Sequence, residues 1–469
     1  MIRVVLFLFL ASVIGLSFVA GLRYSGLWAV YLSFAIAANA LLLAGFRRGA
    51  LYFDTFIGIF LWLGFWLKLS IRVAFLGGEF SEPVGAFDAS PQSFDAVLLV
   101  ATASFSALLL ATFVRERYFS YPAQAPGCAD SGLFLFYRKY RSLVVTVFLV
   151  TIVLAALSNV WLGIYQRGMV TGTVLPFGLN GVYKWALQFG LASISALIVR
   201  FEIELGRRLT PLAIIVPVFE GFMSNTAMLS RGMVLNASAI GVGGLRTMLS
   251  RTMKIGSLRL GAAAALFCLL FVISVLAVNY LRIAAFNMGE EGVQSQTAAV
   301  TGSMTTPLFI DRWVGIEGLM AVASSDIKGW DLWRAAWQER FQEGTPSLYD
   351  QRLIASPYLT PGVDRSRNHF VSLPGMVAFL YYPGSMLFLC ASLLVVAWSA
   401  AFLEYLTYRF CGGNWILCAL FAQVIAFRYA SFGYVPGQSY LLFGSLVLNG
   451  ALILLADRLL RRVQQNGVA

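Results

Sequence analysis

The sequence is poor in charge and in residues that bind metals. Only 12% of its 469 positions are charged, histidine occurs once and cysteine five times. A single histidine cannot form a histidine-cluster metal site, so we expect neither metal catalysis nor a cofactor. Three cysteines lie in apolar runs, and Cys128 and Cys411 fall in segments assigned below to the cytoplasm. No disulfide is therefore expected.

Hydrophobic residues dominate instead. They make up 59% of the chain, and the mean hydropathy is +0.78. One water-soluble core of this length could not bury so much apolar surface. We therefore predict an all-α polytopic membrane protein of about twelve transmembrane helices. Residues 211–245 are interpreted as two of these spans, forming a hairpin that turns near Asn225 to Arg231. The other spans are expected at residues 4–20, 26–45, 52–73, 94–113, 142–162, 180–200, 261–281, 385–404, 413–430 and 438–456.

The placement of the basic residues predicts the orientation. The net charge is +12, but Lys and Arg lie at the ends of the apolar runs and not along a stripe, so no nucleic-acid partner is expected. One orientation puts nineteen Lys and Arg in the cytoplasm and leaves Arg23, Arg167 and Arg428 in the short outer loops. The N- and C-termini are then cytoplasmic. The cytoplasmic basic residues are those at positions 3, 47–48, 115–141, 200–208, 246–259, 409 and 458–462.

The spans divide the chain into three parts. Residues 1–281 hold transmembrane helices 1–9, residues 282–370 form one long periplasmic loop, and residues 371–469 hold a short interfacial or re-entrant helix and helices 10–12. Loops of this length without a role are uncommon, so the loop is expected to carry the chemistry. Within it, Trp330, Trp333 and Trp337 recur at helical spacing, which predicts an amphipathic helix in the membrane interface.

Charged residues inside the predicted spans give a further set of candidates, of which we consider four. Lys68 and Lys184 are near outer ends, where their long side chains can extend to the interface. Asp54 and Glu220 have short side chains and need a partner or water. We interpret Asp54 as structural and Glu220 as a candidate site residue.

Three short segments on the outer side carry further candidates. Ser230-Arg231-Gly232 lies at the mouth of the hairpin, Asp311-Arg312-Trp313 with Glu317 opens a helix in the loop, and His369 ends the loop. Each also has a purely structural interpretation: an arginine that extends to the interface, an ion pair on a loop helix, and a hydrogen-bonding histidine.

The order of these segments resembles the O-antigen ligase and O-antigen polymerase superfamily. Its members have a Ser-Arg-Gly near the start of a span, an Arg-Trp that opens a long periplasmic segment, and a histidine before a glycine-containing apolar stretch. The matching residues here are Ser230-Arg231-Gly232, Arg312-Trp313, and His369 with Leu373 and Gly384, so the resemblance covers roughly residues 225–400. It implies a GT-C-like glycosyltransferase of the bacterial inner membrane, with its active site on the periplasmic side.

The resemblance also implies roles for the candidates. Arg231 and Arg312 would bind the diphosphate of an undecaprenyl-diphosphate-linked oligosaccharide, since an arginine fork meets two phosphate oxygens at once. Arg365 and Arg367 would add phosphate or sugar contacts. His369 would act as the base or orient the acceptor hydroxyl, with Glu317 and Glu220 as competitors for the base.

We expect a polymerase that transfers the lipid-linked glycan to the terminal sugar of another repeat unit, by inversion and without a metal. One alternative is an O-antigen ligase that transfers the glycan to lipid A core. A flippase for lipid-linked sugars, or another transporter, is the alternative of a different class. Membrane lipid is an expected partner, and a chain-length regulator and a flippase are candidates.

Overall fold

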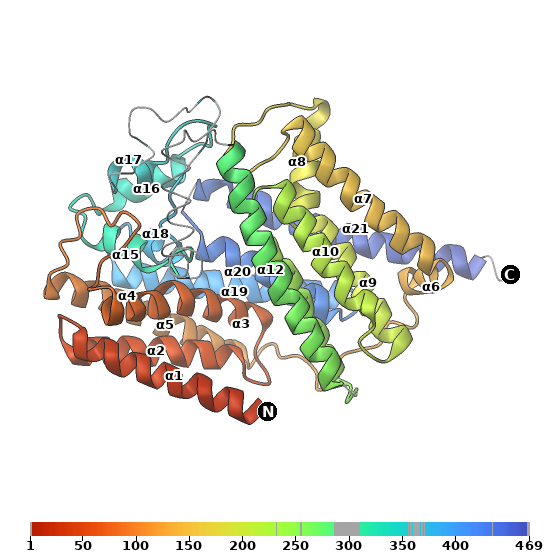
Figure 1. Ribbon diagram of the computed structural model, residues 1–469, viewed down its shortest axis with the longest axis horizontal. Coiled ribbons are helices and arrows are strands. Elements are labelled where there is room, and N and C mark those ends of the chain that lie inside the picture. Colours follow the sequence, from red (N-terminus) through yellow and green to blue (C-terminus); the bar gives the residue numbers. More distant parts are fainter. Residues whose placement is uncertain are drawn as a thin grey trace.

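In the computed structural model, the helices and helical turns are the regular elements of the described residues (Figure 1). The described residues are 2–466 apart from positions 231, 254–255, 286–309, 355, 357–358, 360–365, 367–368, 370 and 434. Every apolar run predicted from the sequence is helical. The helices of the first half are α1 (Ile2–Arg23), α2 (Trp28–Gly45), α3 (Tyr52–Leu61), η1 (Trp62–Leu67), α4 (Lys68–Phe75), α5 (Pro91–Arg115), α6 (Gly132–Lys139), α7 (Arg141–Leu162), η2 (Pro176–Gly178), α8 (Leu179–Trp185), η3 (Ala186–Gly190), α9 (Leu191–Gly206) and α10 (Pro211–Ala227).

The second half begins with the other arm of the predicted hairpin and contains the helices of the long loop. They are α11 (Val234–Ser250), α12 (Ser257–Ala285), α15 (Ile316–Ala323), α16 (Trp330–Gln338), α17 (Leu348–Arg352), α18 (Met376–Leu380), α19 (Met386–Phe410), α20 (Trp415–Ala430), η5 (Pro436–Gln438) and α21 (Ser439–Asn466).

Seven helical segments of the described chain are long and apolar enough to cross a membrane. They are Trp28–Gly45, Tyr52–Phe75, Pro91–Arg115, Arg141–Leu162, Pro176–Gly206, Met386–Phe410 and Pro436–Gln465. Three shorter apolar helices accompany them: Phe7–Arg23, Ala264–Val278 and Trp415–Ala430. The prediction of a helical membrane protein is therefore confirmed, while the number of spans stays a prediction.

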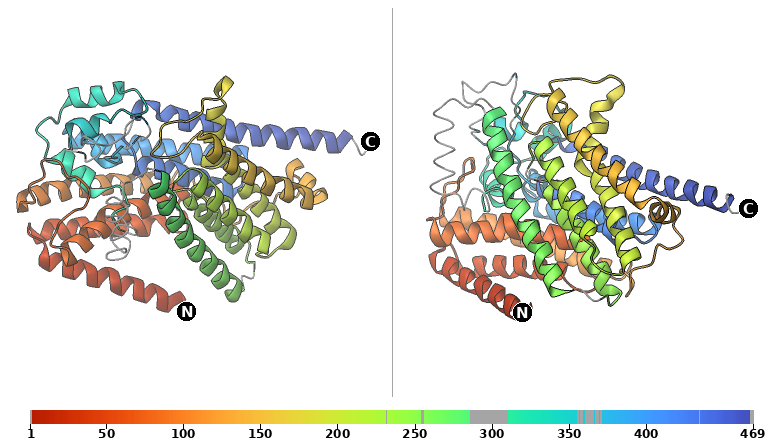
Figure 2. Two further views of the ribbon diagram at one scale, coloured as in Figure 1. Left: turned by 45° about the horizontal axis from the view of Figure 1, so that its top comes forward. Right: turned by 45° about the vertical axis from the view of Figure 1, so that its right-hand side comes forward.

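The connecting segments gather at two ends of the bundle. At one end, Arg246 donates to the carbonyls of Arg48 and Ala50, and Ser131 donates to Asp457. We call this the terminal end, because both chain termini point toward it, and α21 extends past the bundle to the C-terminus (Figure 2). The other end carries α15 to α18, and we call it the loop end (Figure 1). The segments predicted to share the cytoplasm meet at the terminal end.

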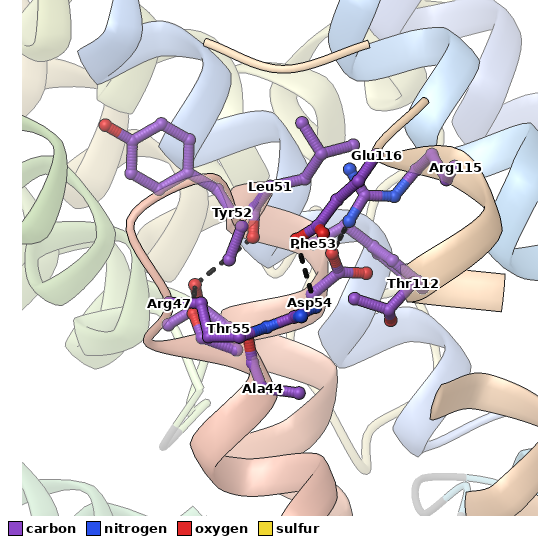
Figure 3. Close-up of polar contacts among 12 residues, drawn as sticks. Ala44, Arg47, Leu51, Tyr52, Phe53, Asp54, Thr55, Thr112, Arg115 and Glu116 are labelled. Atoms are coloured by element: carbon purple, nitrogen blue, oxygen red, sulfur yellow. Dashed lines mark hydrogen bonds and ion pairs between the residues drawn. The ribbon is translucent and has the colours of Figure 1, made fainter. Parts of the chain in front are cut away.

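Asp54 has the structural role predicted for it. Its carboxylate forms an ion pair with Arg115 of α5, and both side chains are buried at the terminal end (Figure 3). Beside them, Arg47 pairs with Glu116 at 3.0 Å, and the Thr55 hydroxyl donates to the Gly45 carbonyl at 2.6 Å. These contacts hold the turn between α2 and α3 against α5.

The hairpin of α10 and α11 turns where the sequence predicted. Asn225 organises the turn: its side-chain oxygen accepts from the Met233 N–H (2.9 Å), its backbone oxygen accepts from the Ser230 N–H (2.9 Å), and its amide donates to Ser274 of α12 (2.5 Å). The side-chain contact to Met233 satisfies a donor that a helix start would otherwise leave unpaired. Leu229 adopts a left-handed conformation with φ of 49°. One buried asparagine thus joins the turn to α12.

The helices predicted around the end of the long loop are also present. In α16, Leu332 and Ala336 are buried and Arg334 is exposed, so the helix is amphipathic, although Trp330 and Trp337 are exposed. Trp333 packs on Phe379 of α18 with ring centroids 4.9 Å apart, so protein covers part of the apolar face. The short helix predicted after the loop is α18, all of whose residues are buried.

Candidate functional site

Two basic residues of α4 anchor the start of the described loop at the loop end. Lys68 Nζ lies 2.9 Å from both carboxylate oxygens of Glu317 and donates to the carbonyls of Asp311 (2.9 Å) and Trp313 (2.5 Å). The Arg72 guanidinium meets the Asp311 carboxylate with two nitrogens, at 3.1 and 2.5 Å. Lys68 is only 1% exposed. The prediction that Lys68 extends to the interface is therefore wrong: it is buried in an ion pair.

The backbone of this anchored segment lies directly on η1. A Cβ on Gly64 would overlap the Val314 carbonyl, and a Cβ on Gly315 would overlap Gly64 itself. On the other side, a Cβ on Gly318 would overlap the Pro374 carbonyl. η1 is a π-helical turn, a local widening that recurs at functional sites. The start of α15 is thus clamped between two backbones, and its carboxylate Glu317 is turned into the protein.

Contacts between rings link the Arg312-Trp313 motif to the hairpin turn. Trp313 stacks on Phe60 (centroids 6.0 Å apart), Phe60 meets Phe427 edge-on (5.7 Å), and a Cβ on Gly232 would lie 3.0 Å from the Phe427 ring. The Arg312 guanidinium lies 5.1 Å from the centroid of the Trp313 ring. Gly232 and Trp313, one from each motif, are therefore linked through the rings of Phe427 and Phe60 at the loop end.

The same guanidinium approaches α12. It lies 5.7 Å from the ring centroid of Phe271, one turn from Ser274, which bonds Asn225 in the hairpin turn. Arg312 is therefore connected to the hairpin by two separate routes. Arg231, Arg365 and Arg367, the other arginines predicted to bind diphosphate, lie outside the described residues.

A closed loop of residues 163–172 joins the hairpin turn to His369. The ends of this loop meet where the Gly172 N–H donates to the Gly163 carbonyl at 2.8 Å. Buried Asn159 fixes this loop. Its amide donates to the carbonyls of Tyr165 (3.0 Å) and Ala227 (2.8 Å), and its side-chain oxygen accepts from the Tyr165 N–H (3.1 Å). One side chain therefore ties this loop to α10.

The same loop forms backbone bonds in two directions. Its Arg167 N–H donates to the Met228 carbonyl of the hairpin turn, and its Gly168 carbonyl accepts from the His369 N–H, each at 2.9 Å. The predicted histidine is therefore one backbone contact away from the loop that lies on the hairpin.

His369 is half-buried and its ring is oriented by neighbours in the long loop. The Gly344 N–H donates to Nδ1 at 3.0 Å, and Phe341 meets the imidazole edge-on. Burial lowers the pKa of His369 from 6.5, opposed by the negative charges of Glu343 and Asp350. Because Nδ1 accepts a hydrogen bond, the neutral ring carries its proton on Nε2.

The structure adds four residues that sequence reasoning did not select for the site. Lys184 Nζ lies 4.8 Å from the Tyr165 ring centroid. Although burial acts in the opposite direction, the nearby charges of Lys184 and Arg167 lower the pKa of Tyr165 below its usual value. Arg428, at the end of α20, interacts electrostatically with Arg167 and Tyr165. The only sequence signal was that Arg167 and Arg428 were basic residues left in short outer loops.

Glu220 is not brought to this site by any contact seen in the described chain. It is fully buried in α10, and its carboxylate accepts a hydrogen bond from Ser224 of the same helix at 2.8 Å. Glu317 is likewise engaged away from the imidazole, by Lys68. Of the three residues predicted as catalytic, His369 alone contacts the loop that lies on the hairpin turn.

Comparison of the chain with protein-family models, with curated proteins and with solved structures gives no match.

Asn159 provides a direct test of how the site is assembled. We expect Asn159→Ala to lower the free energy of unfolding by about 1–3 kcal/mol, because it leaves buried backbone groups of Tyr165 and Ala227 unpaired. Residues 163–172 should also open, so trypsin should cleave after Arg167 faster. Both quantities are measurable in detergent micelles.

Asn180→Ala is the matched control. Asn180 also bonds two backbone groups, of Thr173 and Leu175, but none in the hairpin. Equal cleavage after Arg167 in the two variants would contradict the role of Asn159.

Proposed function

We propose that the protein polymerises undecaprenyl-diphosphate-linked oligosaccharide repeat units in the bacterial inner membrane. In this proposal the chain has about twelve transmembrane helices in a GT-C-like arrangement. The terminal end with both termini faces the cytoplasm, and the loop end faces the periplasm. The polymerase takes a lipid-linked glycan from its carrier and transfers it to the terminal sugar of another lipid-linked unit.

The observation that carries the proposal is the convergence of segments far apart in sequence. The hairpin turn contacts Trp313 through Phe427 and Phe60, and it contacts His369 through residues 167–168. These are the three motif positions on which the family resemblance rests, and an accidental resemblance would not require them to be neighbours.

The chemistry of the residues suits transfer from a diphosphate. As the bond between sugar and diphosphate breaks, negative charge develops on the leaving group, and fixed cations with several donors stabilise it. Arg312 supplies a planar guanidinium that stacks near Trp313 and Phe271. An oligosaccharide hydroxyl attacks the anomeric carbon from the opposite face, which inverts its configuration. The diphosphate leaves with the bonding electrons, and a carboxylate base takes the hydroxyl proton.

His369 supports the acceptor in this proposal. Its Nε2 hydrogen can bond an oxygen of the acceptor sugar and orient it for attack. Glu343 is the stronger candidate for the base, because its charge acts on His369. Its carboxylate oxygens accept from the hydroxyl and the N–H of Thr171, at 2.7 and 2.9 Å. Glu317, paired with Lys68, is the weaker candidate for a base.

A ligase that transfers the glycan to lipid A core would use the same chemistry with a different acceptor. A transporter is the alternative of another class. Against it, the loop end holds anchored segments and a buried α15, whereas a transport pathway would have to open there.

Deletion of the gene separates these functions. We expect the deletion strain to carry a surface glycan of core with a single repeat unit, whereas loss of a ligase would leave bare core and lipid-linked polymer. Complementation with Arg312→Ala should fail, while Arg334→Ala, which removes an exposed cation of the same end, should restore the polymer. An unchanged glycan in the deletion strain would refute both polymerase and ligase.

A further inference from the structure

Two arginines that belong to none of the predicted motifs lie together beside the hairpin turn. Arg167 comes from the loop of residues 163–172 and Arg428 from the end of α20, and each is partly buried. Their charges act on one another and on the Tyr165 ring. Lys184 adds a third cation over the same ring, from the exposed side of α8.

Positive charges that lie close together in a partly buried part of a protein destabilise the folded state. Two guanidinium groups within interaction distance repel one another, and the repulsion grows as water is excluded. A bound anion stabilises such a cluster, because the attraction of each cation to the anion offsets the repulsion between the cations. The arrangement therefore points to a negatively charged ligand.

The position of the cluster is set by the fold and not by flexible side chains alone. Asn159 and the contact of Gly172 with Gly163 fix the loop, and the Arg167 N–H donates to the Met228 carbonyl. Arg428 directly follows Phe427, the ring that touches Gly232 and Phe60. The Arg167 backbone is thus bonded to the turn, and Arg428 is next in sequence to a ring that contacts it.

We propose that Arg167, Arg428 and Lys184, with the Tyr165 hydroxyl, form a binding subsite for the diphosphate of the lipid-linked glycan. This assignment rests on the proposed function and names residues that the family resemblance does not. The subsite lies on the side of the turn that contacts His369, whereas Arg312 approaches from the side of α12.

A diphosphate fits this set better than a single phosphate does. Its two phosphoryl groups offer many acceptor oxygens, and two arginine forks and an ammonium offer a matching number of donors. Tyr165 can donate its hydroxyl hydrogen to the same anion. A phospholipid headgroup offers the same chemistry with less charge, so it should bind here more weakly.

Equilibrium binding tests the subsite without requiring turnover. The full-length protein is placed in nanodiscs of neutral phosphatidylcholine, and the dissociation constant for radiolabelled undecaprenyl diphosphate is measured. Arg167→Gln and Arg428→Gln should each weaken binding by tenfold or more, as the loss of a charge-assisted contact predicts. Arg428→Lys should weaken it less. Arg334→Gln, which removes the same charge from an exposed site on α16, should leave it unchanged.

The outcomes are distinguishable. If Arg167→Gln and Arg428→Gln bind undecaprenyl diphosphate as tightly as the unmodified protein, the subsite assignment is wrong. If phosphatidylglycerol at equal concentration displaces the diphosphate, the cluster is a general headgroup site and the assignment to diphosphate is overturned.

Folding and function are checked separately. The unfolding midpoint of each variant is measured, and if Arg428→Gln unfolds, Arg167→Gln and Arg428→Lys decide the result. Should the unmodified protein bind the diphosphate through these residues yet form no polymer from lipid-linked repeat units, the polymerase proposal fails while the subsite stands.

Discussion

Lys68→Met is expected to lower the free energy of unfolding by about 3–5 kcal/mol, the cost of leaving one partner of a buried ion pair uncompensated. Lys68 and Glu317 have side chains only 1% and 5% exposed, so water cannot replace the lost contact. The ammonium also binds the carbonyls of Asp311 and Trp313, which would lose their donor. The loss should be visible in unfolding of the purified protein in detergent micelles.

The partner substitution should cost less. Glu317→Gln keeps a carbonyl oxygen that Lys68 can still bond, and the ammonium retains the two backbone acceptors. In the double variant Lys68→Met/Glu317→Gln no buried charge of the pair remains, so part of the lost stability should return. The coupling energy from this double-mutant cycle reports the pair itself.

The exposed pair of Arg334 and Asp331 is the control, and Arg334→Ala should have little effect on unfolding. Additive losses in the cycle, or a Lys68→Met variant as stable as Arg334→Ala, would contradict the anchoring role of Lys68.

The helices could be predicted because hydrophobicity over about twenty residues is a local signal. The run at residues 94–113 became α5, and the hairpin turn was visible because Ser224, Asn225 and Thr226 interrupt an apolar stretch. Asp54 was recognised as structural since a short carboxylate inside a span needs a partner, and Arg115 supplies it.

Lys68 shows where this reasoning fails. A lysine near the end of a span ordinarily extends to water, and nothing near it in sequence indicates otherwise. Its partner Glu317 is 249 residues away, in the short apolar helix α15 of the long loop. The packing of Gly64 against Gly315 helps to hold that loop on η1, and such a contact leaves no periodic pattern in the sequence.

The site was predictable in part for the same reason. His369 and Arg312 were selected as candidates because the order of short motifs is carried by the sequence. Arg167 and Arg428 were not, because a basic residue in a short loop looks the same whether it faces solvent or another arginine. Asn159 ties the loop that carries Arg167 to the end of α10, and Phe427, the residue before Arg428, contacts Gly232.

Replacing His369 with amide side chains of different length should show whether it acts as a general base or as a donor that orients the acceptor hydroxyl. His369→Ala is expected to lower the rate of glycan transfer by about 100- to 1,000-fold, the effect of losing one donor aimed at the reacting groups. Glutamine places an amide nitrogen near the position of Nε2, so the transfer rate of His369→Gln should stay within about tenfold of that of the unmodified protein.

Asparagine reaches only the position of Nδ1. His369→Asn can keep the contact with the Gly344 N–H but loses the outer donor, so it should transfer glycan as slowly as the alanine variant. A general base at Nε2 makes a different prediction, because neither amide can accept a proton. Equal and severe loss in the glutamine and asparagine variants would therefore restore the base assignment.

The dependence of the transfer rate on pH provides a second test of the role of the His369 imidazole. Burial lowers the pKa of His369 below 6.5, so the imidazole is neutral above that lowered pKa and charged below it. The imidazolium carries a proton on Nδ1 and cannot accept the Gly344 N–H, so acid should disturb the orientation of the ring.

The transfer rate should accordingly fall as the pH drops through an inflection below 6.5, and it should be level at neutral pH. This inflection should be absent in His369→Gln, because an amide does not titrate in this range. Its persistence in that variant would show that a group other than His369 causes it.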